Sequence, residues 1–487
     1  MTVSNRVRQI ESEIDTSIRA LPTWQAPRAD VLEQLVHIYR DTIEVPLTKL
    51  LLAKACDSPP EDFRAAFEAE HWTRHGVLWA LKWALEYCPE NGLPDTRSPE
   101  ELVRLIDLGT TYEAFVDALK CAQRDLHAIE VDESSRIITC YEGGNATPFD
   151  VDIIQLGRIS TPTTPHMSLT EDSDQLTSRW TAGDYRQVTK MLGNYAASKE
   201  NSIHVDPDFL TNIGKPEISV PQPTVVWLVR PSIAPDCHVF DDLVLPTMID
   251  SQLKWKLVSL LDTPIVSVAD RYCALSSDLK MLSAIDDYML RLAARVDERQ
   301  YSSANRLREE RMIQICGRAL QHCSRPWTLR ERVRYTNPSQ EADILATRNA
   351  ERLVLELKST LRPETPWEVY KRNDDVIGGV KQTRNLIDRG AAEHGFVVTD
   401  GYRGDHTCWA EALSCGVPIA TLYDLEVIAN DPIAAVSDVK SLAGIRGSPP
   451  SPARRLPDRQ AELLNWKLRF VDMSASKEGL TKNDAER

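Results

Sequence analysis

The sequence predicts an α/β protein in which a mostly helical region precedes a carboxy-terminal domain with a central mixed sheet flanked by helices. From residue 29 to about 128, apolar residues recur every three to four positions, which is typical of amphipathic helices. From residue 301 to about 432, helical patterns alternate with short β-rich runs. A chain of 487 residues is also too long for one hydrophobic core, so we expect several domains.

Changes in composition along the chain suggest where these domains begin and end. A loop rich in Ser, Thr and Pro at 160–174 and a proline-rich stretch that begins at 447 are the clearest boundaries. We expect a mostly helical domain with a small mixed α/β segment at 1–160, a mixed then helical region at 161–300, an α/β domain at 301–432, and a linker, short helix and disordered tail at 433–487.

Individual elements follow from local patterns. We expect a frayed helix or arm at 1–28, which is polar, and helices throughout 241–299. Strands are expected at 136–141, 150–156 and 224–230, a helix at 184–198, and the short carboxy-terminal helix at 461–471. Trp79, Trp83 and Tyr87 recur at steps of four and predict a packed aromatic core in preference to a ligand site.

Composition limits the classes of function. A net charge of −15 argues against a protein that coats nucleic acid, so any nucleic-acid surface must be local. The first residues lack the apolar region of a secretory signal, and no apolar run approaches the length of a membrane span. Ten scattered cysteines without a C-x-x-C pair argue against a zinc ribbon and against disulfides. We expect a cytoplasmic protein with no membrane partner.

One segment is locally basic. Residues 301–336 hold eight arginines against three glutamates. Arginine favours bidentate contacts with phosphate, so this stretch is a candidate nucleic-acid surface. The alternative, a solvated helix face with internal ion pairs, applies best to Arg306 and Arg308 beside Glu309 and Glu310. The arginines that we expect to contact nucleic acid are Arg311, Arg318, Arg330, Arg332 and Arg334.

Residues 339–360 predict two strands joined by a turn at Asn349, Ala350 and Glu351. Side chains alternate between the two faces of a strand. The face expected to carry polar groups holds Glu341 and Asp343 on the first strand and Val354, Glu356 and Lys358 on the second. The opposite, apolar face holds Ala342, Ile344 and Ala346, then Leu353, Leu355 and Leu357. Carboxylates beside a sheet are costly unless they are paired or bind a metal, so this arrangement requires an explanation.

The order of elements in residues 301–432 resembles the PD-(D/E)xK nuclease superfamily, whose fold is restriction-endonuclease-like. Asp343 matches the acidic position, and Glu356, Leu357 and Lys358 match the E-x-K motif. The closing segments, from residue 395 to 429, are similar in layout to Mrr-like type IV restriction enzymes. The likeness covers under a third of the chain, and Ala342 stands where the motif has a variable proline.

The resemblance implies an Mg²⁺-dependent endonuclease, in which Mn²⁺ can replace Mg²⁺. Asp343 and Glu356 would hold the metal, as carboxylates hold Mg²⁺ together with a substrate phosphate. Lys358 would orient or deprotonate the attacking water and stabilise negative charge. Gln382, on the following helix, would position the water or a phosphate. Glu310 is a candidate for an additional acidic ligand.

Competing interpretations remain open. The bare triplet also occurs at residues 278–280 and 438–440, so only its strand context distinguishes Glu356. His322 beside Cys323, and His406 near Cys408, lack a recognisable orienting acid for nucleophilic catalysis. Glu341 shares a face with Asp343, but we expect it at the edge of the strand with its side chain in water.

The overall prediction is a nuclease that hydrolyses phosphodiester bonds, with DNA favoured over RNA. The amino-terminal region would serve sensing, target recognition or assembly, and the assembly would be a homo-oligomer or a complex with a protein partner. This layout is similar to bacterial restriction and anti-phage defence effectors. The alternative is a catalytically inactive nuclease-fold protein that binds nucleic acid or protein.

Overall fold

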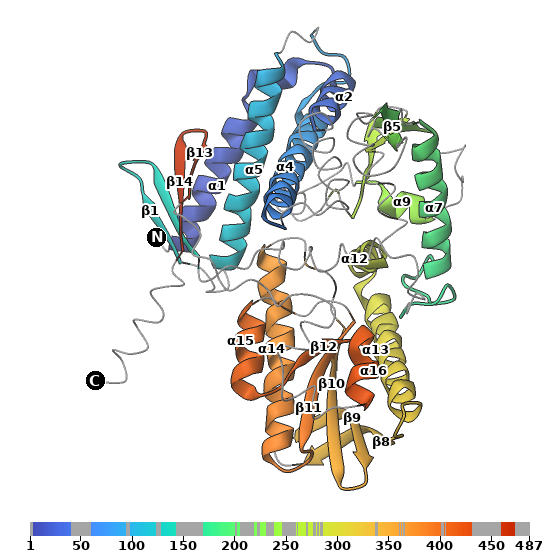
Figure 1. Cartoon of the computed structure of the whole chain (residues 1–487). Coiled ribbons are helices and arrows are strands. Elements are labelled where there is room, and N and C mark those ends of the chain that lie inside the picture. The colour runs from blue at the N-terminus through green and yellow to red at the C-terminus, as the bar shows by residue number, and fades with distance from the viewer. Residues whose placement is uncertain are drawn as a thin grey trace. The chain divides into compact units, whose positions relative to one another are not determined.

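The structure is a computed structural model with mixed α/β architecture and several sheets (Figure 1). It describes residues 3–39, 60–93, 98–122, 128–142, 169–199, 202–204, 219–221, 225–229, 238–245, 286–336, 339–359, 366–400, 406–430 and 459–472, with 260, 262–268, 271–275, 279, 282, 361, 363 and 404. The strand expected at 150–156 lies outside these residues. Among the helices described, none has the length and apolar character needed to cross a bilayer.

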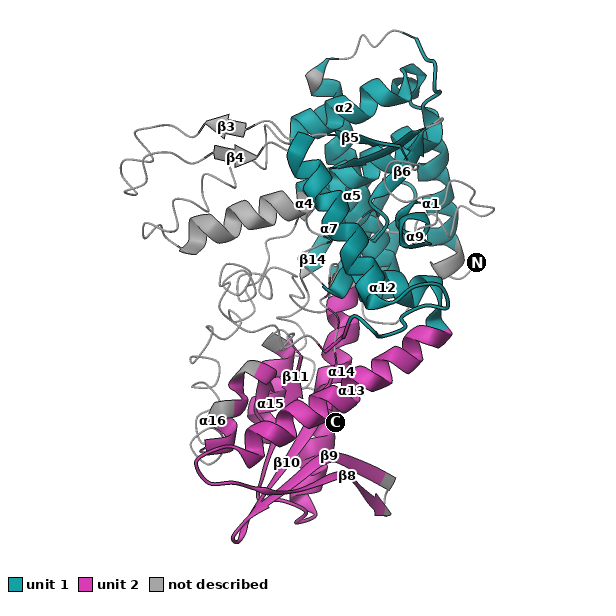
Figure 2. Ribbon diagram, turned by 90° about the vertical axis from the view of Figure 1, so that its right-hand side faces the viewer, with its two compact units in different colours: residues 1–143, 172–298, 456–473 teal, residues 144–171, 299–455, 474–487 magenta. Residues whose placement is uncertain are grey.

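The chain forms two compact units (Figure 2). Unit 1 comprises Met1–Gly143, Asp172–Glu298 and Leu456–Met473, and unit 2 comprises Gly144–Glu171, Arg299–Arg455 and Ser474–Arg487. The regions expected as separate domains at 1–160 and 161–300 thus contribute mainly to one unit. Each unit is described below by itself.

Helices dominate the first part of unit 1, as expected. They are α1 (Val3–Arg19), η1 (Pro22–Gln25), α2 (Arg28–Tyr39), α4 (Pro60–Tyr87) and α5 (Pro99–Ala122). Of the frayed helix or arm expected at 1–28, the helix is present as α1, but the expectation that it is frayed is wrong, because α1 buries Ile10, Ile14 and Ile18 at successive helical turns. The expected aromatic core is confirmed, with Trp79 and Trp83 buried and in edge-to-face contact with Tyr112.

A four-stranded sheet in unit 1 joins segments from opposite ends of the sequence. Its strands are β1 (Ala128–Asp132), β2 (Ile137–Glu142), β13 (Arg459–Leu463) and β14 (Trp466–Asp472), in the order β1-β2-β14-β13. The helix expected at 461–471 is therefore wrong. Leu463, Trp466, Leu468 and Phe470 are buried while Lys467 and Arg469 are exposed, and from Trp466 onward this is the two-residue period of a strand.

The remainder of unit 1 mixes helices with short strands. These are α7 (Ala182–Lys199), β3 (Ser202–His204), β4 (Ser219–Pro221), β5 (Val225–Leu228), α9 (His238–Leu243), β6 (Ile265–Val268), β7 (Arg271–Leu275) and α12 (Asp286–Val296). The helix at 184–198 and the strand at 224–230 are confirmed. The helical expectation for 241–299 is wrong at β6 and β7, which pair with each other and add β5 to a three-stranded sheet.

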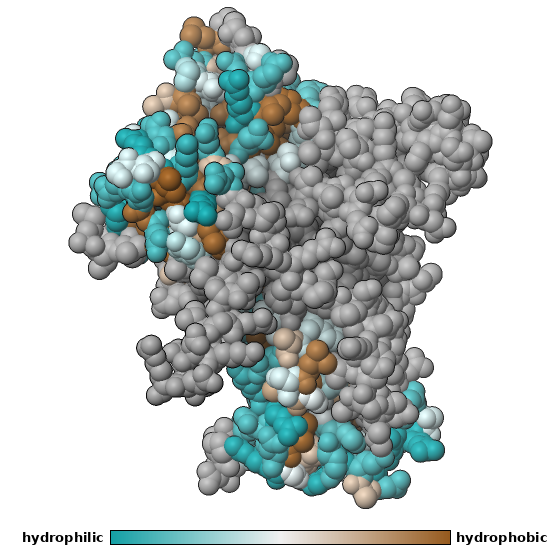
Figure 3. All heavy atoms as spheres, turned by 60° about the vertical axis from the view of Figure 1, so that its left-hand side comes forward, coloured by the Kyte–Doolittle hydropathy of each residue, from teal (hydrophilic) through white to brown (hydrophobic). Residues whose placement is uncertain are grey.

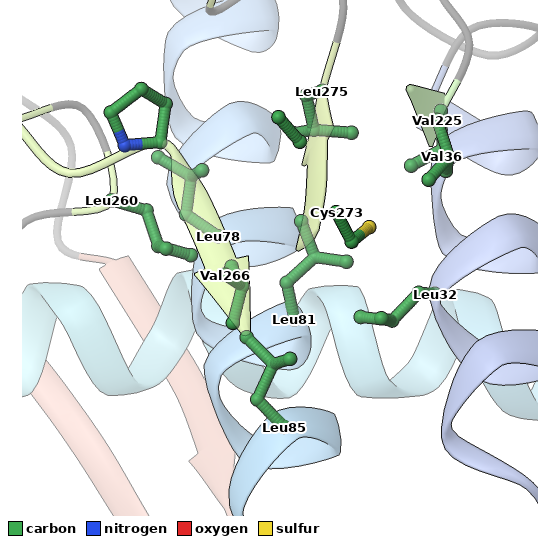
Figure 4. A pocket seen from close by; sticks show the side chains of 12 residues that line it. Leu32, Val36, Leu78, Leu81, Leu85, Val225, Leu260, Val266, Cys273 and Leu275 are labelled. Atoms are coloured by element: carbon green, nitrogen blue, oxygen red, sulfur yellow. The ribbon is translucent and has the colours of Figure 1, made fainter. Parts of the chain in front are cut away.

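A small void lies between this three-stranded sheet and helices α2 and α4 (Figure 4). Leucine, valine and other apolar side chains line it, and Cys273 points among them. Its volume of about 20 Å³ is close to that of one water, and an apolar void of this kind stays dry. Burial raises the pKa of the Cys273 thiol to about 12, so the group is an unreactive part of the core.

Unit 2 is built around a five-stranded mixed sheet, which the sequence predicts. Its elements are α13 (Glu298–Gln321), β8 (Thr328–Thr336), β9 (Ser339–Arg348), β10 (Glu351–Lys358), α14 (Pro366–Asp388), β11 (His394–Thr399), α15 (His406–Cys415), β12 (Ile419–Thr421), η4 (Leu422–Asp424) and α16 (Leu425–Asn430). The strand order is β12-β11-β10-β9-β8. Strands β10, β11 and β12 are parallel, whereas β8, β9 and β10 are joined antiparallel.

Helices cover both faces of this sheet (Figure 1). One face packs Leu353, Leu355 and Ile344 against α13 and α16, and the other packs Val354 and Val397 against α14 and α15. The expected alternation holds along β10. It fails in β9 at one residue, Ala342, which joins the α14 face although Ile344 and Ala346 lie on the α13 face.

Exposed apolar residues in the described part of the chain are scattered. Leu307 and Leu413 are the examples in unit 2, on α13 and α15 respectively. On the face in Figure 3, hydrophilic residues predominate among those coloured, with small hydrophobic areas between them. Single exposed apolar side chains of this kind are ordinary on a protein surface.

Candidate active site

The structure brings Asp343, Glu356 and Lys358 together where β9 meets the carboxyl end of β10. The register of these strands pairs Leu355 with Ile344, so that continuing it by one residue sets Glu356 opposite Asp343. Oδ2 of Asp343 accepts a hydrogen bond of 2.7 Å from the backbone N–H of Leu357. Nζ of Lys358 donates a hydrogen bond of 2.8 Å to Oε1 of Glu356.

Glu356 is buried, with only 2 % of its surface exposed. Its Oε2 has no hydrogen-bond partner among the described residues. Burial, and then the negative charge of Asp343, raise the pKa of Glu356 to about 7, although Lys358 opposes this effect. Burial also raises the pKa of Asp343, whose carboxylate Lys358 and Arg332 stabilise in part.

Two glycines of α14 shape the space above these side chains. A Cβ at Gly379 would lie 3.0 Å from Cε of Lys358 and 3.3 Å from Cγ1 of Val397. The absence of a side chain at Gly379 therefore lets Lys358 reach back to Glu356. The neighbouring Gly378 is exposed, and a Cβ there would meet nothing within 4 Å. Because glycine weakens a helix interior, the Gly378-Gly379 pair was a sequence feature that could have indicated this close approach.

Gln382 takes a different position from the one expected. Its Nε2 donates to the backbone oxygen of Glu341 at 2.9 Å, and Nε2 of Gln340 donates to the backbone oxygen of Gln382 at 2.7 Å. These two bonds tie α14 to β9 two residues before Asp343. The side chain thus has a structural partner beside the site, and its proposed contact with water or phosphate stays a prediction.

Glu310 pairs with arginines. Its Oε1 lies 3.4 Å from Nε of Arg306 and 3.6 Å from Nη2 of Arg332. Among the residues that the structure describes, no group of three or more His, Cys, Asp or Glu side chains is placed to hold a metal ion. Neither Glu310 nor Glu341 therefore completes a three-carboxylate set with Asp343 and Glu356.

The arginines expected to bind nucleic acid divide into two groups. On α13, Arg311 donates to the backbone oxygen of Leu169 and pairs with Glu171, whereas Arg318 is exposed and donates to a carbonyl of its own helix. Arg330, Arg332 and Arg334 are exposed on the edge strand β8. Arg332 is the one that acts on the pKa of Asp343.

A buried ion pair beyond the strand ends escaped the sequence analysis. Arg308 of α13 donates to Oδ2 of Asp400 at 3.1 Å, and both side chains are more than nine-tenths buried. The hydroxyl of Ser359, the residue after Lys358, donates to the same oxygen at 3.0 Å. The pair therefore fixes the chain that leaves β10 next to the lysine. For Arg308 the sequence leaves a solvated helix face and a functional role both open, because its long-range partner Asp400 cannot be inferred from local pattern.

The residues present fit a divalent cation. Two carboxylates lie close enough for one to raise the pKa of the other, and one buried oxygen is without a hydrogen-bond donor. A cation between them would offset both costs. Proteins commonly bind Mg²⁺ through two carboxylates, while water and phosphate occupy the remaining coordination positions.

The other candidate nucleophiles have structural contacts. Cys323 Sγ lies 3.1 Å from the carbonyl oxygens of Leu320 and Arg325 at the end of α13. Cys408 is buried and its thiol lies 3.2 Å from Oδ1 of Asn373.

No protein-family model, curated protein or solved structure matches this chain.

Proposed function

We propose that unit 2 is a metal-dependent nuclease of restriction-endonuclease-like fold, with Asp343, Glu356 and Lys358 as its catalytic residues. The observation that carries this proposal is the buried Glu356, which has an unpartnered oxygen, a neighbouring carboxylate and a lysine at hydrogen-bond distance. The mixed five-stranded sheet between two helical layers supports the fold assignment.

Each residue has a role that suits its surroundings. Asp343 and Glu356 would hold Mg²⁺, which when bound supplies positive charge to the scissile phosphate and makes a nearby water more acidic. Nζ of Lys358 lies 2.8 Å from Oε1 of Glu356 and the side chain is partly exposed, so it can orient the attacking water and stabilise developing negative charge. The bond from the Leu357 N–H fixes the Asp343 carboxylate before substrate arrives.

The proposal predicts metal-dependent cleavage. Purified protein is incubated with supercoiled plasmid, linear duplex DNA and RNA, with Mg²⁺, Mn²⁺ or EDTA. We expect products only with metal, DNA cut in preference to RNA, and a loss of at least about 100-fold in Asp343→Asn. Asp374→Asn, an exposed aspartate on α14, is the matched control and should cleave like the wild type.

Metal binding gives a second readout that does not depend on turnover. In calorimetric titrations with Mn²⁺, wild type and Asp374→Asn should bind the ion, and Asp343→Asn should bind it at least about tenfold more weakly. Equal metal binding and equal cleavage by all three proteins would refute the assignment. Binding of nucleic acid without cleavage, unaffected by Asp343→Asn, would favour a binding protein.

A further inference from the structure

A polar groove runs beside the candidate active site within unit 2. Its volume is about 680 Å³, and it lies between the start of β9, the end of β8 and helix α14. The lining residues that determine its charge and shape are Arg334, Glu341, Gly378, Lys381, Asn385 and Arg389. Three are cationic and one is anionic, in a chain whose net charge is −15.

The groove adjoins the proposed catalytic residues. Glu341 lies two residues before Asp343, and Gly378 adjoins Gly379, over which Lys358 passes. The charge of Glu341 also contributes to the raised pKa of both Asp343 and Glu356, so that these groups are within electrostatic reach of one another. An occupant of the groove would therefore contact residues that directly neighbour the proposed site.

Two cations of the groove, Arg334 and Lys381, are largely exposed. Arg334 is 84 % exposed where it pairs with Glu341, and Lys381 is 62 % exposed and 3.8 Å from its nearest carboxylate oxygen, on Glu411. Exposed ion pairs of this kind contribute about 0–1 kcal/mol. A phosphate can replace such a partner at little cost, because Arg and Lys form charge-assisted hydrogen bonds with phosphate as they do with carboxylate.

Helix geometry sets these groups in a row. Lys381, Asn385 and Arg389 follow one another at intervals of four, and the N–H of Arg389 still donates to the carbonyl of Asn385 as in a helix. Successive members of such a row share a face and are about 6 Å apart along the axis. The row is therefore about 12 Å long, which corresponds to three or four base-pair steps of about 3.4 Å along the axis of a duplex.

We propose that this groove holds the sugar-phosphate backbone of the nucleic acid that is cleaved, with Lys381, Arg389 and Arg334 as its phosphate contacts. The inference rests on the proposed function and names the substrate-binding surface of the same site. It keeps Arg334 of β8, which the sequence analysis names, and adds Lys381 and Arg389, which lie on or directly after α14. The exposed Gly378 leaves the floor of the groove open.

The test measures binding by the full chain in EDTA, with fluorescein-labelled duplex DNA, single-stranded DNA and single-stranded RNA as probes. Lys381→Glu is compared with Lys371→Glu, which makes the same change at an exposed lysine about 15 Å along the helix and outside the groove. We expect Lys381→Glu to weaken the best probe about tenfold or more and Lys371→Glu less than about twofold.

A second variant and the salt dependence guard against misfolding. Gly378→Glu puts a carboxylate into open space in the groove. We expect it to weaken binding as Lys381→Glu does, while its thermal unfolding midpoint is no lower than that of Lys371→Glu. For duplex DNA, Lys381→Gln should reduce the slope of log K against log salt by about 0.9.

The outcomes separate this inference from the proposed function. If wild type cleaves and the groove variants bind like Lys371→Glu, the groove assignment is overturned and the nuclease proposal stands. If Lys381→Glu abolishes binding although wild type cleaves nothing with Mg²⁺ or Mn²⁺, the groove assignment stands and the nuclease proposal loses its support. If wild type binds no probe, the groove assignment is overturned.

Discussion

At the scale of single residues, Glu356 is the group whose surroundings require the most explanation. A buried carboxylate with an unpartnered oxygen reduces the stability of the fold whenever it is ionised. Proteins retain such a group where function needs it. In the absence of metal, protonation is the means by which the folded chain relieves this cost.

The raised pKa of Glu356 makes the stability of the metal-free protein depend on pH. The folded-state pKa of about 7 exceeds the ordinary glutamate value of 4.5, so the folded state binds more protons than the unfolded state between these pH values. The free energy of unfolding of unit 2 should therefore fall, by up to roughly 3 kcal/mol, as pH rises from about 4.5 to 7. Urea titrations of the protein in EDTA at pH 5 and pH 8 measure this change.

Glu356→Gln provides the control for this pH effect. The amide cannot ionise, so the variant should lose most of that pH dependence and exceed the wild type in stability at pH 8 in EDTA. Mg²⁺ should raise the stability of the wild type at pH 8 and leave the variant unchanged, because binding requires the carboxylate. A wild type that gains stability from pH 5 to pH 8 in EDTA would contradict the assignment.

The close approach of Lys358 to Gly379 gives a second residue-scale prediction. In Gly379→Ala the new Cβ would displace the flexible end of Lys358, so we expect cleavage to fall about tenfold or more with little loss of stability. In Gly378→Ala the new Cβ meets open space, and helix propensity should raise the free energy of unfolding by about 0.5–1 kcal/mol. Cleavage assays and denaturant titrations distinguish the two; undiminished cleavage by Gly379→Ala would count against Lys358.

At the scale of elements, the ion pair between Arg308 and Asp400 fastens α13 to the ends of β10 and β11. Removing one partner of a buried pair leaves the other charge uncompensated. Ser359, the residue after Lys358, donates a hydrogen bond to the same carboxylate. The pair therefore supports the segment from which the proposed catalytic lysine projects.

Arg308→Ala should lower the free energy of unfolding by about 3–5 kcal/mol, because Asp400 would stay buried without that cation. Arg306→Ala, on the same helix but with a side chain 73 % exposed, should cost less than about 0.5 kcal/mol. Denaturant titrations of both variants measure the difference. Similar costs for the two arginines would show that the buried pair does not stabilise this end of the sheet.

At the scale of the whole molecule, the last described strands belong to the first unit. β14 pairs in parallel with β2, residues that lie more than 300 positions apart in sequence, and the hairpin buries Leu463 and Leu468. Unit 1 is thus completed by a segment that follows all of the sheet of unit 2 along the chain. Pairing of such distant segments is a late and slow event in folding.

Changes in this hairpin should therefore act on unit 1. Leu468→Ala removes a fully buried side chain from β14 and should cost about 2–5 kcal/mol. Lys467→Ala, its exposed neighbour, should cost less than about 0.5 kcal/mol. Denaturant titrations of both variants measure the difference, and a Leu468→Ala transition that matched that of Lys467→Ala would show that the strand is dispensable.

Local sequence determined the elements of unit 2 and the three residues at its centre. The alternation along β10, the turn at Asn349, whose φ is +53°, and the period of α14 depend on neighbouring residues, and each agrees with expectation. Local sequence therefore sufficed to place Glu356 and Lys358 on one face of a strand next to Asp343.

Tertiary structure decided what depends on distant partners. Arg308 meets Asp400, Gln382 bonds to β9, Glu310 pairs with Arg332, and residues 459–472 form strands because β2 offers them an edge. None of these contacts leaves a periodic trace in the sequence, since each joins residues that are far apart in the chain. The burial of Glu356, and with it the physical case for a metal site, also arises only when α14 covers the sheet.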